Sequence, residues 1–340
     1  MRFLDLFAGI GGFRLALEQA GHKCIGFCEI DKFARQTYKA NFNTEGEVEW
    51  HDITTVTDED VRQLGSVDII TAGFPCQAFS VAGKRGGFED TRGTLFFEIA
   101  RIARILKPRY LLLENVKGLL NHSGGTTFAT ILNVLGELGY WVEWQILNSK
   151  DFGVPQNRER VFIVGHFGGE PRRKVFPITR SSGQALTELT RGLADAYRVY
   201  DPAGVARTLK AEAGGVGAKT GLYAVSCTLD ANYYKGLGSN QKRTGVVELG
   251  GLYTNTSNDF MRKPLKGLSR TLKAQKHDAA VTDGVRIRRL TPLECFRFQG
   301  FPDEFFHRAK AAGVSDSQLY KQAGNAVTVT VVYEIAKRLG

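Results

Sequence analysis

The sequence predicts an α/β protein with a parallel sheet, joined to a separate loop-rich module that is mostly β structure. Three observations support this fold class. Residues 1–170 alternate short apolar segments with helical stretches, the pattern of a parallel α/β sheet. From about residue 171, glycine-rich turns and short basic segments replace that alternation. Regular structure returns over 317–340, where an apolar helix that reaches Leu339 is predicted.

The elements of the first region are predicted from short β-branched runs and from helical periodicity between them. Val67–Ala72 illustrates a strand, because it is apolar, β-branched and stopped by Gly73 and Pro75. By the same criteria we expect strands near residues 2–7, 23–28, 67–72, 109–114, 143–149 and 160–166. Helices are expected over residues 12–19, 32–41, 94–106 and 127–138.

Composition excludes several classes of protein. Hydrophobic residues make up 43% of the chain and charged residues 24%, as in ordinary globular proteins. No apolar run approaches the roughly 18 residues of a membrane span, and a strand predicted from residue 2 leaves no room for a signal or transit peptide. The five cysteines are scattered, which favours a reducing cytoplasm, and neither they nor the six histidines have metal-site spacing. We therefore expect a cytoplasmic protein without a membrane segment or a metal.

The positive charge of the chain is concentrated in one region. Residues 171–300 contain 22 Lys and Arg against 10 Asp and Glu, whereas the rest of the chain contains 23 against 25. The whole excess of +10 therefore comes from the loop-rich module. A basic segment of this length beside a nearly neutral α/β region favours a polyanion as partner.

The first predicted strand runs into a glycine turn, Gly9-Ile10-Gly11-Gly12, that precedes a helix. Glycines at a helix N-terminus let a ligand approach the backbone. A dinucleotide fingerprint needs glycine at the sixth position of the motif, where this chain has Arg14, so a nicotinamide enzyme is disfavoured. Glu29 ends the second strand, where a carboxylate can accept two hydrogen bonds from a ribose diol, and Asp52 and Ile53 could contact an adenine. These residues indicate a nucleoside cofactor.

Three further segments place reactive side chains beside predicted strands. Phe74-Pro75-Cys76-Gln77 follows the strand at 67–72, and Glu114-Asn115-Val116 ends the strand at 109–114. Gln156-Asn157-Arg158-Glu159-Arg160 leads into the strand at 160–166. Open α/β sheets bind ligands at the carboxyl ends of their strands. A thiol, a carboxyl and a guanidinium brought together there suggest a nucleophile, a proton donor and a clamp.

With these segments in this order, the chain resembles the cytosine-C5 DNA methyltransferases of bacterial or phage restriction-modification systems. The resemblance continues through residues 289–302 (RLTPLECFRFQGFP) and ends with Gly324-Asn325-x-Val327, leaving about 171–285 uncovered. It implies a doubly wound class I methyltransferase sheet, mostly parallel with one antiparallel strand, that binds S-adenosylmethionine. Residues 1–170 and 303–340 would form the catalytic and cofactor-binding domain. Residues 171–302 would form a target recognition domain, with a bracing segment at 288–302.

The resemblance also assigns roles in the reaction. Cys76 would add to C6 of a flipped cytosine, which makes C5 nucleophilic enough to take a methyl group. Glu114 would be protonated in a water-poor pocket that raises its pKa, and it would donate to N3 of the cytosine. Arg160, with Arg158 beside it, would hold the O2 edge, and Pro75 would shape the turn and contact the amino group. Asn115 would position the loop of Glu114.

Cofactor and DNA contacts complete the implied site. The cofactor contacts are Phe7, Gly9, Ile10, Gly11, Gly12, Glu29, Ile30, Asp52, Ile53, Leu95 and Asn325, where Ile30 stands in a position that is aromatic in some family members. Residues 78–93 contain four glycines and are predicted to form a mobile lid. The expected DNA contacts are Lys84, Arg85 and Arg92 in this lid and Arg207, Lys235 and Arg270 in the basic module.

The partner implied is double-stranded DNA, with a monomeric enzyme that is functionally paired with a restriction endonuclease. Two alternatives stay open: an RNA cytosine-C5 methyltransferase on the same scaffold, and a catalytically inactive DNA-binding regulator. The long basic module disfavours the first, since structured RNA is read largely by shape. Intact Cys76, Glu114 and Arg160 disfavour the second. Cys295, inside the bracing segment, is interpreted as a packing residue.

Overall fold

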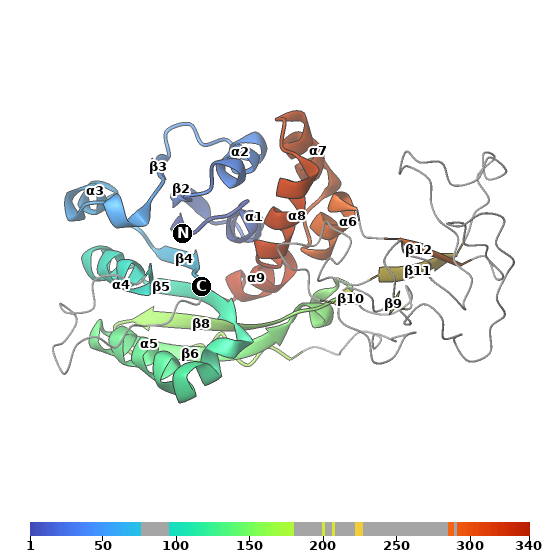
Figure 1. Ribbon diagram of the computed structural model, residues 1–340. Helices are drawn as coiled ribbons and strands as arrows, with labels where there is room; N and C mark the ends of the chain where they lie inside the picture. The colour runs from blue at the N-terminus through green and yellow to red at the C-terminus, as the bar shows by residue number, and fades with distance from the viewer. Residues whose placement is uncertain (76–94, 180–198, 201–205, 208–221, 227–284, 289–290) are drawn as a thin grey trace, which may run out of the picture. The chain divides into compact units, whose positions relative to one another are not determined.

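The computed structural model describes residues 1–75, 95–179, 199–200, 206–207, 222–226, 285–288 and 291–340 (Figure 1). The chain divides into two compact units. The first comprises residues 1–183, 208–212 and 292–340, and the second comprises 184–207 and 213–291. Four short strands are described in the second range: β9 (Val199–Tyr200), β10 (Ala206–Arg207), β11 (Leu222–Ser226) and β12 (Val285–Arg288). Strand β11 pairs with β12 in antiparallel and with β9 in parallel orientation.

The first unit is built on a seven-stranded sheet in the order β3-β2-β1-β4-β5-β8-β6. Its strands are β1 (Arg2–Leu6), β2 (Lys23–Cys28), β3 (Val48–Trp50), β4 (Ile69–Gly73), β5 (Tyr110–Val116), β6 (Tyr140–Asn148) and β8 (Glu159–Phe167). Strand β8 runs antiparallel to both of its neighbours, β5 and β6, while the pairs from β3 to β5 are parallel. The predicted mostly parallel sheet with one antiparallel strand is confirmed.

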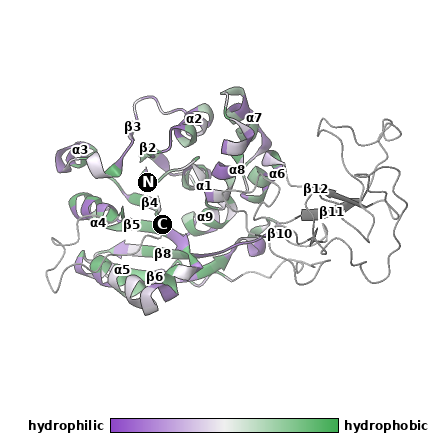
Figure 2. Cartoon of the chain, viewed as in Figure 1, coloured by the Kyte–Doolittle hydropathy of each residue, from purple (hydrophilic) through white to green (hydrophobic). Residues whose placement is uncertain are grey.

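Helices cover both faces of this sheet. The helices described in this unit are α1 (Gly12–Gln19), α2 (Lys32–Asn41), α3 (Asp58–Gln63), α4 (Leu95–Leu106), α5 (Thr126–Glu137), α6 (Pro292–Phe298), α7 (Asp303–Ala311), α8 (Asp316–Asn325) and α9 (Val329–Ala336). Leu4, Leu6 and Ile70 point into a core with α3, α4 and α5. Alternate strand positions face the other way, where α1 brings Phe13 next to Gly73. Figure 2 shows hydrophobic residues along the central strands, which are buried on both faces.

The glycine turn before α1 depends on close packing as well as on backbone conformation. Gly9 and Gly11 have φ values of +56° and +88°, in the left-handed region. A Cβ on Gly11 would lie 2.3 Å from Cε2 of Phe42, and one on Gly12 would lie 2.8 Å from Cγ1 of Val327. A Cβ placed on Gly9 would have no neighbouring atom within 4 Å among the described residues. Gly11 and Gly12 therefore admit neighbouring side chains, whereas Gly9 borders open space.

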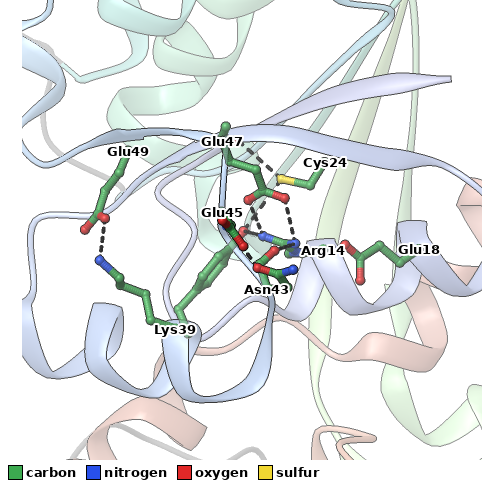
Figure 3. A network of polar contacts seen from close by, with 10 residues as sticks. Arg14, Glu18, Cys24, Lys39, Asn43, Glu45, Glu47 and Glu49 are labelled. Atoms are coloured by element: carbon green, nitrogen blue, oxygen red, sulfur yellow. Dashed lines mark hydrogen bonds and ion pairs between the residues drawn. The ribbon is translucent and has the colours of Figure 1, made fainter.

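Arg14, the residue that breaks the dinucleotide pattern, is buried and fully engaged (Figure 3). Its guanidinium donates to both carboxylate oxygens of Glu47 at 2.7 and 2.8 Å and to Glu18 at 2.8 Å. It also lies 4.5 Å from the ring centroid of Phe42. A planar, bidentate cation suits this setting. Arg14 thus ties the first helix after the glycine turn to the segment that follows α2.

Candidate active site

A cavity of about 440 Å³ opens at the carboxyl ends of β1, β2, β4 and β5. Parallel α/β sheets bind small ligands at this edge, and the volume is typical of such sites. The described residues that line it all belong to the first unit. The lining residues are Phe7, Gly9, Ile10, Glu29, Asp31, Ala34, Gly73, Phe74, Pro75, Glu114, Asn115, Val116, Arg158, Arg160, Lys321, Gln322, Gly324, Asn325 and Ala326.

The structure brings Glu114 and Arg160 into direct contact in this cavity. Strands β5 and β8 pair in antiparallel register, with Val116 opposite Arg160. Nε of Arg160 lies 2.9 Å from Oε1 of Glu114, and these side chains are 17% and 12% exposed. Asn115 donates to the carbonyl of Phe74 at 2.9 Å and accepts from the amide of Val116 at 2.8 Å. Asn115 therefore fastens the end of β5 to the segment that carries Pro75.

Arg158 lies two residues before Arg160 and is almost completely buried. Its guanidinium donates to the carbonyl oxygens of Gly324 and Ala326 at 3.2 and 3.0 Å. Burial, and then the charge of Arg160, lowers the pKa of Arg158 to about 9, so the group remains a cation at neutral pH. The guanidinium thus holds the turn between α8 and α9 against the cavity.

Glu29 occupies the end of the cavity formed by the glycine turn. Its two carboxylate oxygens accept from the backbone amides of Gly9 and Asp31, each at 2.8 Å. Burial raises the pKa of Glu29, while these two amides act in the opposite direction. Asp31 caps the N-terminus of α2, and its Oδ2 lies 2.7 Å from Nζ of Lys321 in α8. The carboxylate of Glu29 is therefore held in a fixed orientation toward the cavity.

Five lining residues were not named in the sequence analysis: Asp31, Ala34, Lys321, Gln322 and Ala326. Asp31 carries a recognisable signal, because an Asp directly before a predicted helix is a favoured N-cap. Its ion pair with Lys321 joins residues 290 positions apart in the sequence, a separation that no local pattern reports. Gln322 is anchored in the same way, since it accepts from Thr37 of α2 at 2.8 Å.

Several described residues that were expected to contact the cofactor are not among those that line the cavity. Gly11 and Gly12 face other side chains, and Ile30 is 68% exposed. Asp52 caps the short 3-10 helix Ile53–Thr55 through the amide of Thr54, and Ile53 is buried in the core against which Leu95 packs. Cys76, Lys84, Arg85, Arg92, Lys235, Arg270 and the predicted lid at 78–93 lie outside the described residues, and Arg207 is described by its backbone in β10.

The other cysteines of the described residues are buried. Cys24, Cys28 and Cys295 are free, and burial raises the pKa of each thiol to about 12. Such thiols are poor nucleophiles, which agrees with the packing role predicted for Cys295. Among the described residues, no group of three or more His, Cys, Asp or Glu side chains is arranged to hold a metal ion. The helices described here are all too short or too polar to cross a membrane.

Comparisons with known proteins agree on one family. The family model of the C-5 cytosine-specific DNA methylases matches residues 1–340. The type II methyltransferase M.HpaII of Haemophilus parainfluenzae is 40% identical over 354 residues, which cover 99% of this chain and 88% of the relative. The orphan methyltransferase M.SPRI of Bacillus phage SPR is 33% identical over 429 residues, which cover 100% of this chain and 97% of the relative. The crystal structure of a DNMT2 mutant from Spodoptera frugiperda has a similar fold, with a TM-score of 0.66, 19% identity and 99% coverage of both chains.

The mixed seven-stranded sheet with helices on both faces thus has the fold of a methyltransferase. The chain belongs to the C-5 cytosine-specific DNA methylase family. It is an enzyme of DNA methylation, so the predicted family and class of activity are confirmed. Membership of this family implies a methyl donor and DNA as the substrate.

Proposed function

We propose that this enzyme transfers a methyl group from S-adenosylmethionine to C5 of a flipped cytosine in a specific double-stranded DNA site, through a covalent bond between Cys76 and C6. The observation that carries the proposal is the cavity that Pro75, Glu114 and Arg160 share. Cys76 directly follows Pro75 in the chain, and the carboxyl and guanidinium already meet at 2.9 Å. These are the groups that addition of a thiolate to a pyrimidine requires.

Each side chain has one task in this proposal. The thiolate of Cys76 adds to C6, while Glu114 supplies a proton to N3 and Arg160 holds the O2 edge. C5 then forms a bond to the methyl carbon as the methyl–sulfur bond of the donor breaks. Loss of the C5 proton to water returns the electron pair to the ring and expels Cys76 as the thiolate, and return of the N3 proton to Glu114 gives the neutral aromatic base. Arg158 supports Arg160 and the turn at residues 324–326.

The other end of the cavity fits a nucleoside-bearing methyl donor. Open space beside Gly9 leaves room for a ligand against the backbone, and Glu29 presents a fixed carboxylate to a ribose diol. Phe7, Ile10 and Asn325 line the same cavity and would contact the donor. S-adenosylmethionine, when bound, supplies the electrophilic methyl group.

We assign target recognition to residues 171–302, with 288–302 as the bracing segment between this module and the catalytic domain. The charge excess of the region supports this assignment, because phosphate contacts need Lys and Arg. The proposed phosphate contacts are Lys84, Arg85, Arg92, Arg207, Lys235 and Arg270. A functional pairing with a restriction endonuclease, a monomeric state and a cytoplasmic location complete the proposal. Free, buried cysteines support a reducing compartment.

The decisive experiment combines methyl transfer with covalent trapping. The full-length enzyme is incubated with radiolabelled S-adenosylmethionine and duplex DNA, and separately with the same duplex containing 5-fluorocytosine, whose fluorine cannot leave as a proton. We expect transfer in the first case and a stable adduct in the second, with both lost in Cys76→Ala and retained in the matched control Cys295→Ala. Turnover by Cys76→Ala would refute the covalent mechanism. Preferred methylation of transfer RNA over duplex DNA would favour the RNA alternative.

A further inference from the structure

A closed ring of buried hydrogen bonds lies behind the cavity wall formed by residues 324–326. Gln299, at the end of α6 and within the bracing segment, donates from Nε2 to the carbonyl of Ala323 at 2.7 Å. Its Oε1 accepts from Oγ1 of Thr328 at 2.9 Å. Oγ1 of Thr328 lies 2.8 Å from Oγ of Ser149, the residue that directly follows β6. Gln299, Thr328 and Ser149 are each at most 2% exposed.

Arg158 closes this ring. The amide of Ser149 donates to the carbonyl of Arg158 at 3.0 Å. The guanidinium of Arg158 donates in turn to the carbonyls of Gly324 and Ala326, the residues that follow Ala323. Buried hydrogen bonds thereby join three separate segments, near residues 149–158, 299 and 323–328. The segment 324–326 that they enclose forms part of the cavity.

The chemistry of the ring fixes the directions of the hydrogen bonds at Gln299. A backbone carbonyl can only accept, so Ala323 requires the amino group of Gln299 and turns its oxygen toward Thr328. Thr328 must then donate to Gln299, since a hydroxyl has a single proton. Ser149 is left to donate to Thr328 at 2.8 Å or, over a longer contact of 3.4 Å, to the carbonyl of Arg158. Among the described residues, loss of the Thr328 hydroxyl would leave Oε1 of Gln299 and Oγ of Ser149 with only their longer contacts, each of 3.4 Å, to Nε2 of Gln156 and to the carbonyl of Arg158.

Thr328 shows that the ring takes precedence over local helix capping. It is the N-cap residue of α9, where a threonine hydroxyl ordinarily accepts from an amide of the first turn. Within the described residues its side chain makes no such bond, and the hydroxyl is directed to Gln299 and Ser149 instead. The backbone of Gln299 joins the same helix, because its carbonyl accepts from the amide of Val329 at 2.8 Å.

We propose that Gln299 and Thr328 are positioning residues for methyl transfer. They hold the turn at 324–326, and with it Asn325 and the Arg158 guanidinium, in the orientation that the cavity requires. Neither side chain is part of the cavity wall as described. The bracing segment therefore has a second role, because it orders the catalytic pocket through Gln299. This inference rests on the proposed roles of Asn325 and Arg158.

The test uses matched variants of the full-length enzyme. Thr328→Val removes the hydroxyl while keeping the shape, Thr328→Ser restores it, and Thr127→Val is the control. Thr127 is a buried threonine of α5 whose hydroxyl lies 2.7 Å from His122, outside the ring. For each variant we measure the dissociation constant of S-adenosylhomocysteine by calorimetry, the rate of adduct formation with 5-fluorocytosine DNA, and the melting temperature.

Thr328→Val should weaken binding of S-adenosylhomocysteine and slow adduct formation by about three- to tenfold, the loss expected for one buried hydrogen bond. Thr328→Ser should recover both to within about twofold, and Thr127→Val should leave both unchanged. Equal behaviour of Thr328→Val and Thr328→Ser would overturn the inference, as would losses that merely follow the melting temperature in all variants. If Thr328→Val does not fold, Gln299→Met and Ser149→Ala provide the same comparison. Failure of the wild-type enzyme to methylate DNA would refute the proposed function separately.

Discussion

Replacing Asp5 by Asn should stabilise the enzyme, and the gain should grow steadily as the pH rises from 5 to 8. Asp5 lies in the middle of β1 and is fully buried. Its Oδ1 accepts from Oγ1 of Thr71 at 2.8 Å, while Oδ2 has no hydrogen-bond partner among the described residues. Burial raises the pKa of Asp5 from 3.8 to about 7, against the opposing effects of Thr71 and Arg14. The folded protein therefore keeps this acid protonated far above its usual range.

The size of the effect follows from the two pKa values. Between pH 3.8 and about 7 the folded state binds more protons at Asp5 than the unfolded state, so stability falls as pH rises. From pH 5 to pH 8 this loss amounts to about 2.6 kcal/mol, at about 1.36 kcal/mol per pKa unit. Asn has the shape of the neutral acid and does not titrate. The variant should therefore gain about 2.6 kcal/mol relative to the wild type over that interval.

Urea unfolding followed by tryptophan fluorescence measures this difference in the right part of the molecule. The three tryptophans, Trp50, Trp141 and Trp144, all belong to the first unit, so the signal reports the sheet that contains Asp5. Glu45→Gln, which removes an exposed carboxylate, is the control and should give a pH dependence parallel to the wild type. Parallel curves for Asp5→Asn and the wild type from pH 5 to pH 8 would refute the assignment of a neutral buried acid.

Three other substitutions test the site and its support. Arg14→Met should lower the free energy of unfolding by about 3–5 kcal/mol, measured by urea titration, because it leaves Glu47 without its buried partner; a loss below about 1 kcal/mol would contradict this. Gly11→Ala should cost about 2–5 kcal/mol in thermal unfolding, from the contact with Phe42 and the left-handed backbone, and a near-neutral result would show that the turn yields easily. Glu114→Gln should slow methyl transfer roughly 10²–10⁴-fold in single-turnover assays while DNA binding persists, and unchanged turnover would exclude it as the proton donor.

Elements with strong local signals were predictable from the sequence, and short or long-range features were not. Helix α2 begins and ends where its periodicity predicts, at Lys32 and Asn41, and the structure adds Asp31 as its N-cap. Strand β3 and helix α3 have three and six residues, too few for a periodic pattern to stand out. The position of Glu114 at the ligand-binding edge followed from its place at a strand end. Arg160 precedes its strand and reaches the same edge because β8 runs antiparallel to β5, which the local pattern did not indicate.

In the glycine turn, the sequence alone predicted a cofactor contact at every position. Four consecutive small or apolar positions at a helix N-terminus look equally suited to a ligand. Gly9 borders open space, yet Gly11 and Gly12 lie against Phe42 and Val327, which come from distant parts of the chain. The sequence does not distinguish a glycine that leaves room for a ligand from one that leaves room for a neighbouring side chain. The difference lies in tertiary neighbours that no window of local sequence contains.

The C-terminal segment shows why the site depends on both ends of the chain. Helix α9 packs against α1, and α8 is bonded to α2 through Thr37–Gln322 and the Asp31–Lys321 ion pair. These contacts bring residues 321–326 to a cavity whose other described lining residues come from the first 160 positions. The basic module lies between these two parts in sequence, so the catalytic unit cannot form its pocket before residues on both sides of the module have met. Truncation within the module should therefore abolish binding of the methyl donor as well as of DNA, even though Glu29 and Glu114 remain.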